Sequence, residues 1–271
     1  MERDLIYDVG MYDGTDTDFY LKKGFRVVAI EANPELVRRA RQRFADAIAS
    51  ARLTILNVVV SDHDGPSTFY VSRALDEGWS TALSGFARQM GERPGAHFEP
   101  IDVESRRFES ILEAHGVPYY LKVDVEGAEL LCLRALEQFS ERPMYVSVEV
   151  PDRSAFAELE QHEYEDLCRL FLLGYRGFKI LDQRFHSRIE LPEPAREGRY
   201  VAHEFRGHTT GPFGEETPGS WLPFEQVVPA YAAALRRMHP AWFDLHARRP
   251  AAVSSAQTVA QRSAPRSSPR R

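Results

Sequence analysis

The sequence predicts an α/β protein built on a doubly wound, mainly parallel β-sheet. Strand-like and helix-like segments alternate in the first part of the chain, the strand-like runs are short and apolar, and the helix-like segments show the 3.6-residue period of amphipathic helices. This alternation is typical of a parallel sheet with helices on its faces. Right-handed crossovers then restrict the topology to a doubly wound sheet.

Three strand-like runs come first. Leu5–Val9 and Phe25–Glu31 are apolar, and Leu53–Val60 is rich in β-branched residues. A helix-like segment at 15–23 separates the first two runs, and Gly24 is expected to end it in a left-handed conformation.

The second gap begins with Asn33-Pro34, which is typical of an N-cap followed by the first helical residue. The helix that follows carries its apolar residues on one face: Leu36, Val37, Ala40, Phe44 and Ile48.

Later elements follow from the same criteria. Asp64-Gly65 is expected to form a hairpin turn before a strand at 67–71, and 78–95 a loop or short helix over the site. The remaining predictions are helices at 107–115, 129–139, 154–173 and 224–238, core strands at 119–124 and 144–150, and closing strands at 175–181 and 199–205.

Composition excludes several classes of protein. The 271 residues are 43% hydrophobic and 27% charged, as in globular proteins. No run of ~18 apolar residues is present, and the charged N-terminus lacks the features of a secretory signal. Cys132 and Cys168 lie in apolar, helix-like patterns, as expected of reduced thiols. We therefore expect a cytoplasmic protein with no membrane partner.

Charge is spread unevenly along the chain. The net charge is −6, yet Arg248–Arg271 contains six arginines and no acid, which leaves 28 basic and 40 acidic residues in 1–247. Phosphate neutralisation requires clustered Lys and Arg, so no nucleic-acid partner is expected. We expect one domain over 1–247, in which 206–247 forms a lid and helix extension, and a disordered tail over 248–271.

The first chemical motif is a glycine turn after the first predicted strand. Asp8-Val9-Gly10 is followed by Gly14, a spacing unlike the Gly-x-Gly-x-x-Gly of dinucleotide-binding proteins. Glu31 ends the second strand, where a carboxylate can accept hydrogen bonds from both hydroxyls of a ribose. A purely structural turn and a solvated carboxylate are the alternatives. Together the two features favour a nucleoside-containing cofactor without phosphates.

The second motif runs from Lys122 to Glu129. Period-2 alternation places Lys122 and Asp124 on one face of a strand that should lie beside the first strand, at the point where strand order reverses. Asp8 and Asp124 would then flank one crevice. Burying these charges is costly unless they function or pair. The structural alternative is an ion pair of Lys122 with Asp124 or Glu149.

These motifs, in this order, resemble the FkbM-type S-adenosylmethionine-dependent methyltransferases. The resemblance covers about residues 4–205 and rests on Asp8–Gly10 with Gly14, on Ala29–Pro34 and, most specifically, on Leu121–Glu129. It departs from the family at Met11-Tyr12, where many members have Ala-Asn. It implies a class I methyltransferase fold, which is Rossmann-like, with a mainly parallel seven-stranded sheet and an antiparallel closing strand. S-adenosyl-L-methionine contains a ribose, no phosphate and a cation that an acidic site favours.

The resemblance also implies roles for individual residues. Asp8 and Gly10 would line the methionine end of the cofactor, Glu31 would hold the ribose, and Ser61-Asp62 would approach the adenine. Asp124 would lie near the amino group and the transferred methyl. The implied cofactor-binding residues are Asp8, Gly10, Gly14, Glu31, Ala32, Ser61, Asp62 and Asp124.

Transfer to a hydroxyl requires alignment of the reactants and a base that takes the proton. Glu149 ends the next strand, so its carboxylate should converge with that of Asp124. Such a pair could instead hold Mg²⁺ that orients a diol, although no residue is assigned as a metal ligand. The candidate catalytic residues are Asp124, Glu126, Glu149 and His208.

The family resemblance favours O-methylation of a small-molecule acceptor such as a sugar or secondary metabolite. The segments 79–97 and 208–221 are expected to shape the acceptor pocket. Transfer to nitrogen is an alternative within this activity. An NAD-dependent oxidoreductase is disfavoured because the dinucleotide motif is missing. A non-catalytic nucleoside-binding module is disfavoured because Asp8, Glu31 and Asp124 are retained.

Overall fold

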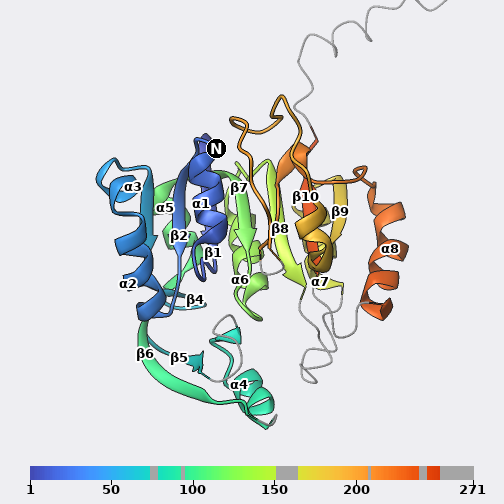
Figure 1. Cartoon of the computed structure of the whole chain (residues 1–271). Helices are drawn as coiled ribbons and strands as arrows, with labels where there is room; N and C mark the ends of the chain where they lie inside the picture. Colours follow the sequence, from blue (N-terminus) through green and yellow to red (C-terminus); the bar gives the residue numbers. More distant parts are fainter. Residues whose placement is uncertain (74–78, 93–94, 151–163, 207–208, 238–242, 251–271) are drawn as a thin grey trace, which may run out of the picture.

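The structure is a computed structural model that describes residues 1–250 except 74–78, 93–94, 151–163, 207–208 and 238–242. Two sheets make up the fold (Figure 1). Among the described helices, none combines the length and the apolar character that a membrane crossing requires.

The main sheet has seven strands in the order β3-β2-β1-β7-β8-β10-β9. All neighbouring pairs are parallel except those of β10, which runs antiparallel to both β8 and β9. This arrangement confirms the predicted mainly parallel sheet with an antiparallel closing strand. The strands are β1 (Glu2–Val9), β2 (Arg26–Ile30), β3 (Leu53–Leu56), β7 (Pro118–Val123), β8 (Tyr145–Val150), β9 (Gly177–Asp182) and β10 (Phe243–Arg248).

Helices cover both faces of this sheet because alternate strand residues point to opposite sides. Ile6 and Tyr120 pack with α1–α3 on one face, whereas Tyr7 and Leu121 pack with α5–α8 on the other. The helices are α1 (Thr15–Lys22), α2 (Pro34–Arg43), α3 (Ala45–Ala49), α5 (Phe108–His115), α6 (Glu129–Ala135), α7 (Glu165–Leu172) and α8 (Phe224–Arg237). Short 3₁₀ turns are η2 (Leu136–Gln138), η5 (Gln183–Arg188) and η6 (Gly214–Glu216).

A smaller sheet projects beyond the carboxyl ends of the main strands, with α4 (Ser84–Gly91) at its far end (Figure 1). Its order is β4-β6-β5, formed by β4 (Val59–Ser61), β5 (Gly65–Ser72) and β6 (Phe98–Arg107). β6 was not predicted, because most of its residues are polar and half-buried or exposed.

The small sheet corrects two predictions. The expected strand 53–60 divides at Asn57, whose side-chain amide donates to the carbonyls of Glu31 and Ala32 at 3.0 Å each. This contact holds the chain where β3 ends, and β4 leaves for the other sheet. Asp64-Gly65 does not form a β-hairpin turn, because β6 lies between β4 and β5.

Two predicted helices and one predicted strand differ from the described structure or extend beyond the described residues. The long helix after Pro34 divides at Phe44, and Ile48 is 36% exposed. The segment 199–205 forms no strand; the closing strand is β10, which lies inside the sheet, so part of the expected extension 206–247 belongs to the core. Of the predicted helix 154–173, only the part from 164 onward lies within the described residues.

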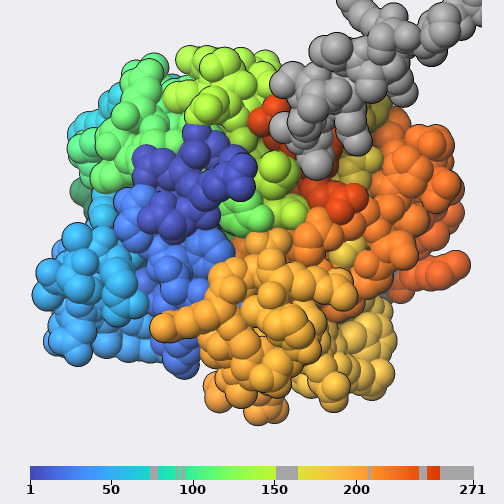
Figure 2. Space-filling model, turned by 90° about the horizontal axis from the view of Figure 1, so that it is seen from above, coloured from blue at the N-terminus to red at the C-terminus, as the bar shows by residue number. Residues whose placement is uncertain are grey.

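The segment that follows β9 packs against the first strand–helix unit. Figure 2 shows this gold-to-orange segment beside the blue N-terminal region. Arg199 N–H donates to the Lys23 carbonyl at 3.0 Å, and Phe213 stacks on Tyr120 with ring centroids 4.6 Å apart. Residues that follow β9 therefore cover, together with α1, one face of the main sheet.

Candidate active site

A cavity of about 450 Å³ opens at the carboxyl ends of the central strands. Its lining includes residues directly after β1, β2 and β7, together with Glu149 near the end of β8, as expected for ligand sites in doubly wound sheets. Phe69 of β5 and Trp79 contribute from the side of the small sheet. The walls therefore combine the motifs at the strand ends with residues of the small sheet.

The glycine turn after β1 is shaped by close backbone contact. Gly10 has a φ of 82°, and a Cβ placed there would lie 1.7 Å from the Asp124 carbonyl oxygen. The N–H groups of Gly10 and Met11 both donate to the Ile30 carbonyl at 3.0 Å. Gly14 does not line the cavity; a Cβ there would meet the Phe44 ring at 2.8 Å. Gly10 thus belongs to the site, whereas Gly14 serves packing.

Glu31 lines the cavity, as does Ala32 beside it. The two Glu31 oxygens accept hydrogen bonds from the N–H groups of Tyr12, at 2.9 Å, and Asn33, at 2.8 Å. Burial raises the pKa of Glu31 to about 7. The carboxylate is therefore held in one orientation by two backbone donors, at the position where the sequence predicts a ribose acceptor.

Asp8 does not line the cavity, contrary to its expected place at the methionine end. It is fully buried, accepts a hydrogen bond from the Thr17 hydroxyl at 2.6 Å, and lies 3.0 Å from the Lys122 ammonium. Lys122 also donates to the Gly10 carbonyl at 2.5 Å. The predicted structural ion pair exists, but its nearest carboxylate is Asp8, and Asp124 lies farther away at 3.6 Å.

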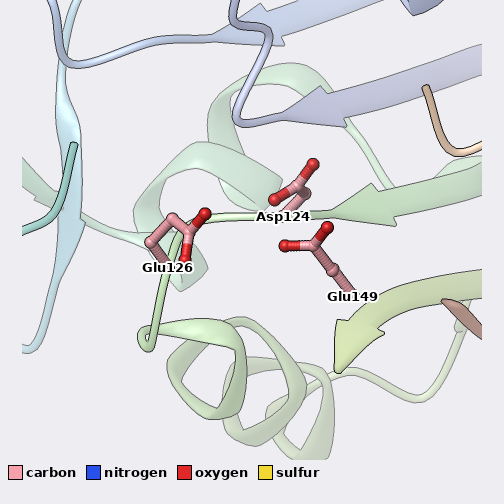
Figure 3. Close-up of side chains that lie close together, drawn as sticks. All are labelled: Asp124, Glu126 and Glu149. Atoms are coloured by element: carbon pink, nitrogen blue, oxygen red, sulfur yellow. The ribbon is translucent and has the colours of Figure 1, made fainter. Parts of the chain in front are cut away.

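Asp124, Glu126 and Glu149 converge at the ends of β7 and β8 (Figure 3). One oxygen of each lies within 4.8 Å of the others, so the three could hold a divalent cation. Glu149 accepts a hydrogen bond from the Gln183 amide at 2.7 Å. Burial, and then the neighbouring carboxylates, raise the pKa of Glu149 well above its usual range. A carboxylate in that state accepts a proton more readily than an exposed one.

Ser61 and Asp62, which were expected to approach the adenine, lie outside the cavity lining. Asp62 is exposed and pairs with His63 at 2.8 Å. The strand break at Asn57 carries Ser61 into the small sheet. The cavity wall on this side is apolar and suits a flat ring: Leu36, Val58, Val59, Val60 and Phe69. His208 lies outside the described residues.

Sequence reasoning did not propose Asp16 or Gln183 as site residues, although both line the cavity. Asp16 lies in the first turn of α1, where an acid is ordinarily explained by the helix dipole. Gln183 lies directly after β9 in a 3₁₀ turn. No motif marks either position, since each becomes a site residue only through the packing of distant segments.

Comparisons with known proteins found a family model, a curated relative and solved structures that resemble this chain. The family model described as "Methyltransferase FkbM domain" matches residues 8–180, well over half of the chain. A curated relative, a probable ribosomal RNA small subunit methyltransferase A of Methanospirillum hungatei, is 28% identical over 109 residues, which are 34% of this chain and 41% of that protein.

Solved structures that the chain matches include an FkbM methyltransferase of Methylobacillus flagellatus, with 16% identity and a TM-score of 0.33 over 54% of this chain and 32% of that one. Another is a SAM-dependent methyltransferase of Archaeoglobus fulgidus, with 10% identity and a TM-score of 0.39 over 91% of this chain and 86% of that one. The chain thus spans less than half of the curated relative and about a third of the FkbM structure.

Proposed function

Because the chain belongs to the FkbM methyltransferase family, we propose that it transfers the methyl group of S-adenosyl-L-methionine to a hydroxyl of a small molecule, such as a sugar or secondary metabolite. One observation carries this proposal. The described cavity lining contains six carboxylates, those of Asp13, Asp16, Glu31, Asp124, Glu126 and Glu149, and one lysine, Lys122. Such a site favours a cationic ligand such as a sulfonium over an anionic dinucleotide.

The lining fits the parts of this cofactor in order. Glu31 would accept the ribose hydroxyls, and the apolar wall that includes Val59 and Phe69 would take the adenine ring. The turn at Gly10 would lie against the methionine portion, because its backbone can approach a ligand closely. When bound, the cofactor supplies an activated methyl group on sulfur.

Glu149 is our proposed base for the acceptor. Its buried carboxylate has a raised pKa, and Gln183 holds its position through a hydrogen bond. As the oxygen–methyl bond forms and the sulfur–methyl bond breaks, Glu149 takes the hydroxyl proton. The neighbouring carboxylates of Asp124 and Glu126 disfavour the negative charge of Glu149, which favours its protonated form after the transfer.

A divalent cation held by Asp124, Glu126 and Glu149 is the alternative role for these residues. A bound Mg²⁺ would lower the pKa of the acceptor hydroxyl and orient a diol. A chelator separates the two roles. Full turnover in EDTA supports Glu149 as base, whereas activity lost in EDTA and restored by Mg²⁺ supports the cation.

A small-molecule acceptor is proposed in preference to a nucleic acid. The excess of acids over bases in 1–247 and the acidic cavity both oppose phosphate binding. An amine acceptor remains the alternative to a hydroxyl, because the same carboxylates would attract a cationic amine. Competing trials of hydroxylated and amine acceptors with isotopically labelled cofactor would decide between them.

Ligand-dependent thermal unfolding tests the cofactor assignment. S-adenosylmethionine and S-adenosylhomocysteine should each raise the melting temperature, because a ligand that prefers the native state stabilises it. NAD serves as the control and should have no effect. Stabilisation by NAD without any response to the S-adenosyl compounds would overturn the proposal in favour of an oxidoreductase.

A further inference from the structure

Asp16 is a buried carboxylate at the cavity wall whose hydrogen-bonding capacity is only partly used. It lies in the first turn of α1 and is 6% exposed. Its Oδ2 accepts a hydrogen bond from the Thr210 N–H at 3.1 Å, whereas Oδ1 has no hydrogen-bond partner among the described residues. Burying a polar atom without a hydrogen bond destabilises the protein, so a ligand that donates a hydrogen bond to Oδ1 would be bound favourably.

The nearby ammonium of Lys122 does not hydrogen-bond to the Asp16 carboxylate. The Lys122 ammonium is 3.9 Å from Oδ2 of Asp16, beyond hydrogen-bond distance, and lies closer to Asp8 at 3.0 Å. Burial raises the pKa of Asp16 to about 7, with Lys122 opposing that effect. The cavity wall therefore offers a carboxylate that gains from an additional cationic donor.

The other carboxylates near the glycine turn and the ribose position have partners. Asp8 accepts a hydrogen bond from Thr17, forms an ion pair with Lys122 and does not line the cavity. Both oxygens of Glu31 accept backbone N–H groups. With the ribose at the end of β2, a ligand that extends toward Asp124 must pass the end of β1, where Asp16 lines the wall.

We propose that Asp16 binds the α-ammonium group of S-adenosylmethionine, an inference that rests on the proposed function. The sulfonium of this cofactor carries no N–H donor, whereas the ammonium carries three, so the ammonium is the cation that can satisfy Asp16 through hydrogen bonds. The terminal torsion of an aspartate is soft, which lets the carboxylate turn to meet the ligand. Asp16 would thus select amino-acid-bearing adenosyl ligands.

The test compares two ligands that differ in one group, S-adenosylhomocysteine and its deamino analogue, in which hydrogen replaces the α-amino group. Isothermal titration with the wild-type chain should show about a tenfold or greater preference for S-adenosylhomocysteine. Asp16→Asn keeps an oxygen for the Thr210 N–H and removes the charge. This variant should bind S-adenosylhomocysteine about tenfold to hundredfold more weakly, with affinity for the deamino analogue unchanged.

Asp18→Asn is the matched control, since Asp18 lies on the same helix, pairs with Lys22 at 2.6 Å and does not line the cavity. It should leave both affinities unchanged. Equal losses for the two ligands in Asp16→Asn, or no loss, would overturn the assignment. Equal wild-type affinities would overturn it even if the variant failed to fold. Wild-type protein that binds neither compound would refute the proposed function and this inference with it.

Discussion

At the scale of single residues, partners decide which of the strand-end acids can serve a ligand. Asp8 lies near the end of β1, Glu31 directly follows the neighbouring strand β2, and both residues are buried. Asp8 meets an ammonium and a hydroxyl and is turned away from the cavity. Glu31 meets two backbone N–H groups, which fix its carboxylate while leaving it at the cavity wall. Two acidic residues at the ends of adjacent strands therefore differ in role, since one is held in a buried ion pair and the other lines the cavity.

Replacing Glu31 by glutamine should weaken S-adenosylhomocysteine binding at pH 8 by about tenfold, because hydrogen bonds to a charged acceptor are the stronger ones. The pKa of Glu31 is about 7, so the wild-type carboxylate becomes protonated as the pH falls through that value. Wild-type affinity should therefore decline between pH 8 and pH 6, and the Glu31→Gln variant should show a smaller decline.

Isothermal titration at several pH values measures both effects. Asp16 also titrates near pH 7 but is present in both proteins, so the difference between their pH profiles reports Glu31. If affinity depended on pH in the same way in the wild type and the variant, Glu31 would not contact the ligand.

At the scale of elements, the turn between β1 and α1 depends on its contact with the end of β7. Asp124 N–H donates to the Val9 carbonyl at 3.0 Å, which draws the two strand ends together. This leaves no room for a side chain at Gly10. The glycine is thus required both by its positive φ and by the neighbouring strand.

Two glycine substitutions separate these requirements. Gly219 has a φ of 81°, close to that of Gly10, but nothing lies within 4 Å of a Cβ there. Gly219→Ala should lower the free energy of unfolding by about 1 kcal/mol through backbone strain. Gly10→Ala should cost at least about 2 kcal/mol more because of the overlap with Asp124. Urea unfolding measures both, and equal losses would show that the contact is unimportant.

At the scale of the whole molecule, a buried ion pair connects the first helix with a segment almost 200 residues later. Lys23 and Glu216 lie 2.7 Å apart with side chains that are 1% and 0% exposed. Glu216 also accepts the N–H groups of Arg196 and Glu197. The pair thus joins the C-terminal end of α1 to the segments around Arg196 and Glu216.

Glu216→Gln should lower the free energy of unfolding by about 3 kcal/mol, because the ammonium of Lys23 stays buried without a counter-charge. Glu35→Gln is the control, since Glu35 forms exposed pairs with Arg38 and Arg39 on α2. The control should change the urea midpoint far less, because solvent screens exposed pairs. A Glu216→Gln midpoint as high as that of the control would show that the buried pair is dispensable.

Sequence patterns predict six of the seven strands of the main sheet and several acids near its edge. Strand periodicity and the carboxyl-end rule for parallel sheets predict that Glu31, Asp124 and Glu149 lie at one edge, and all three line the cavity. The sequence pattern does not predict β10, because Asp244 and His246 of this strand are buried. A strand that carries charged residues into the interior gives no hydrophobic alternation to recognise.

By itself, the sequence determined six strands of the main sheet, most of the helices that cover it and the acidic character of the site, because these follow from local periodicity and from residue type. Only the tertiary structure decided which acids face the cavity. Asp8 is held in an ion pair with Lys122 and does not line the cavity. Ser61 lies in the small sheet because the chain leaves the main sheet at Asn57. Asp16 lines the cavity and contacts Thr210 from a segment late in the chain. The physical reason is that a carboxylate's role depends on partners a few ångströms away, and those partners come from parts of the chain that no local pattern connects.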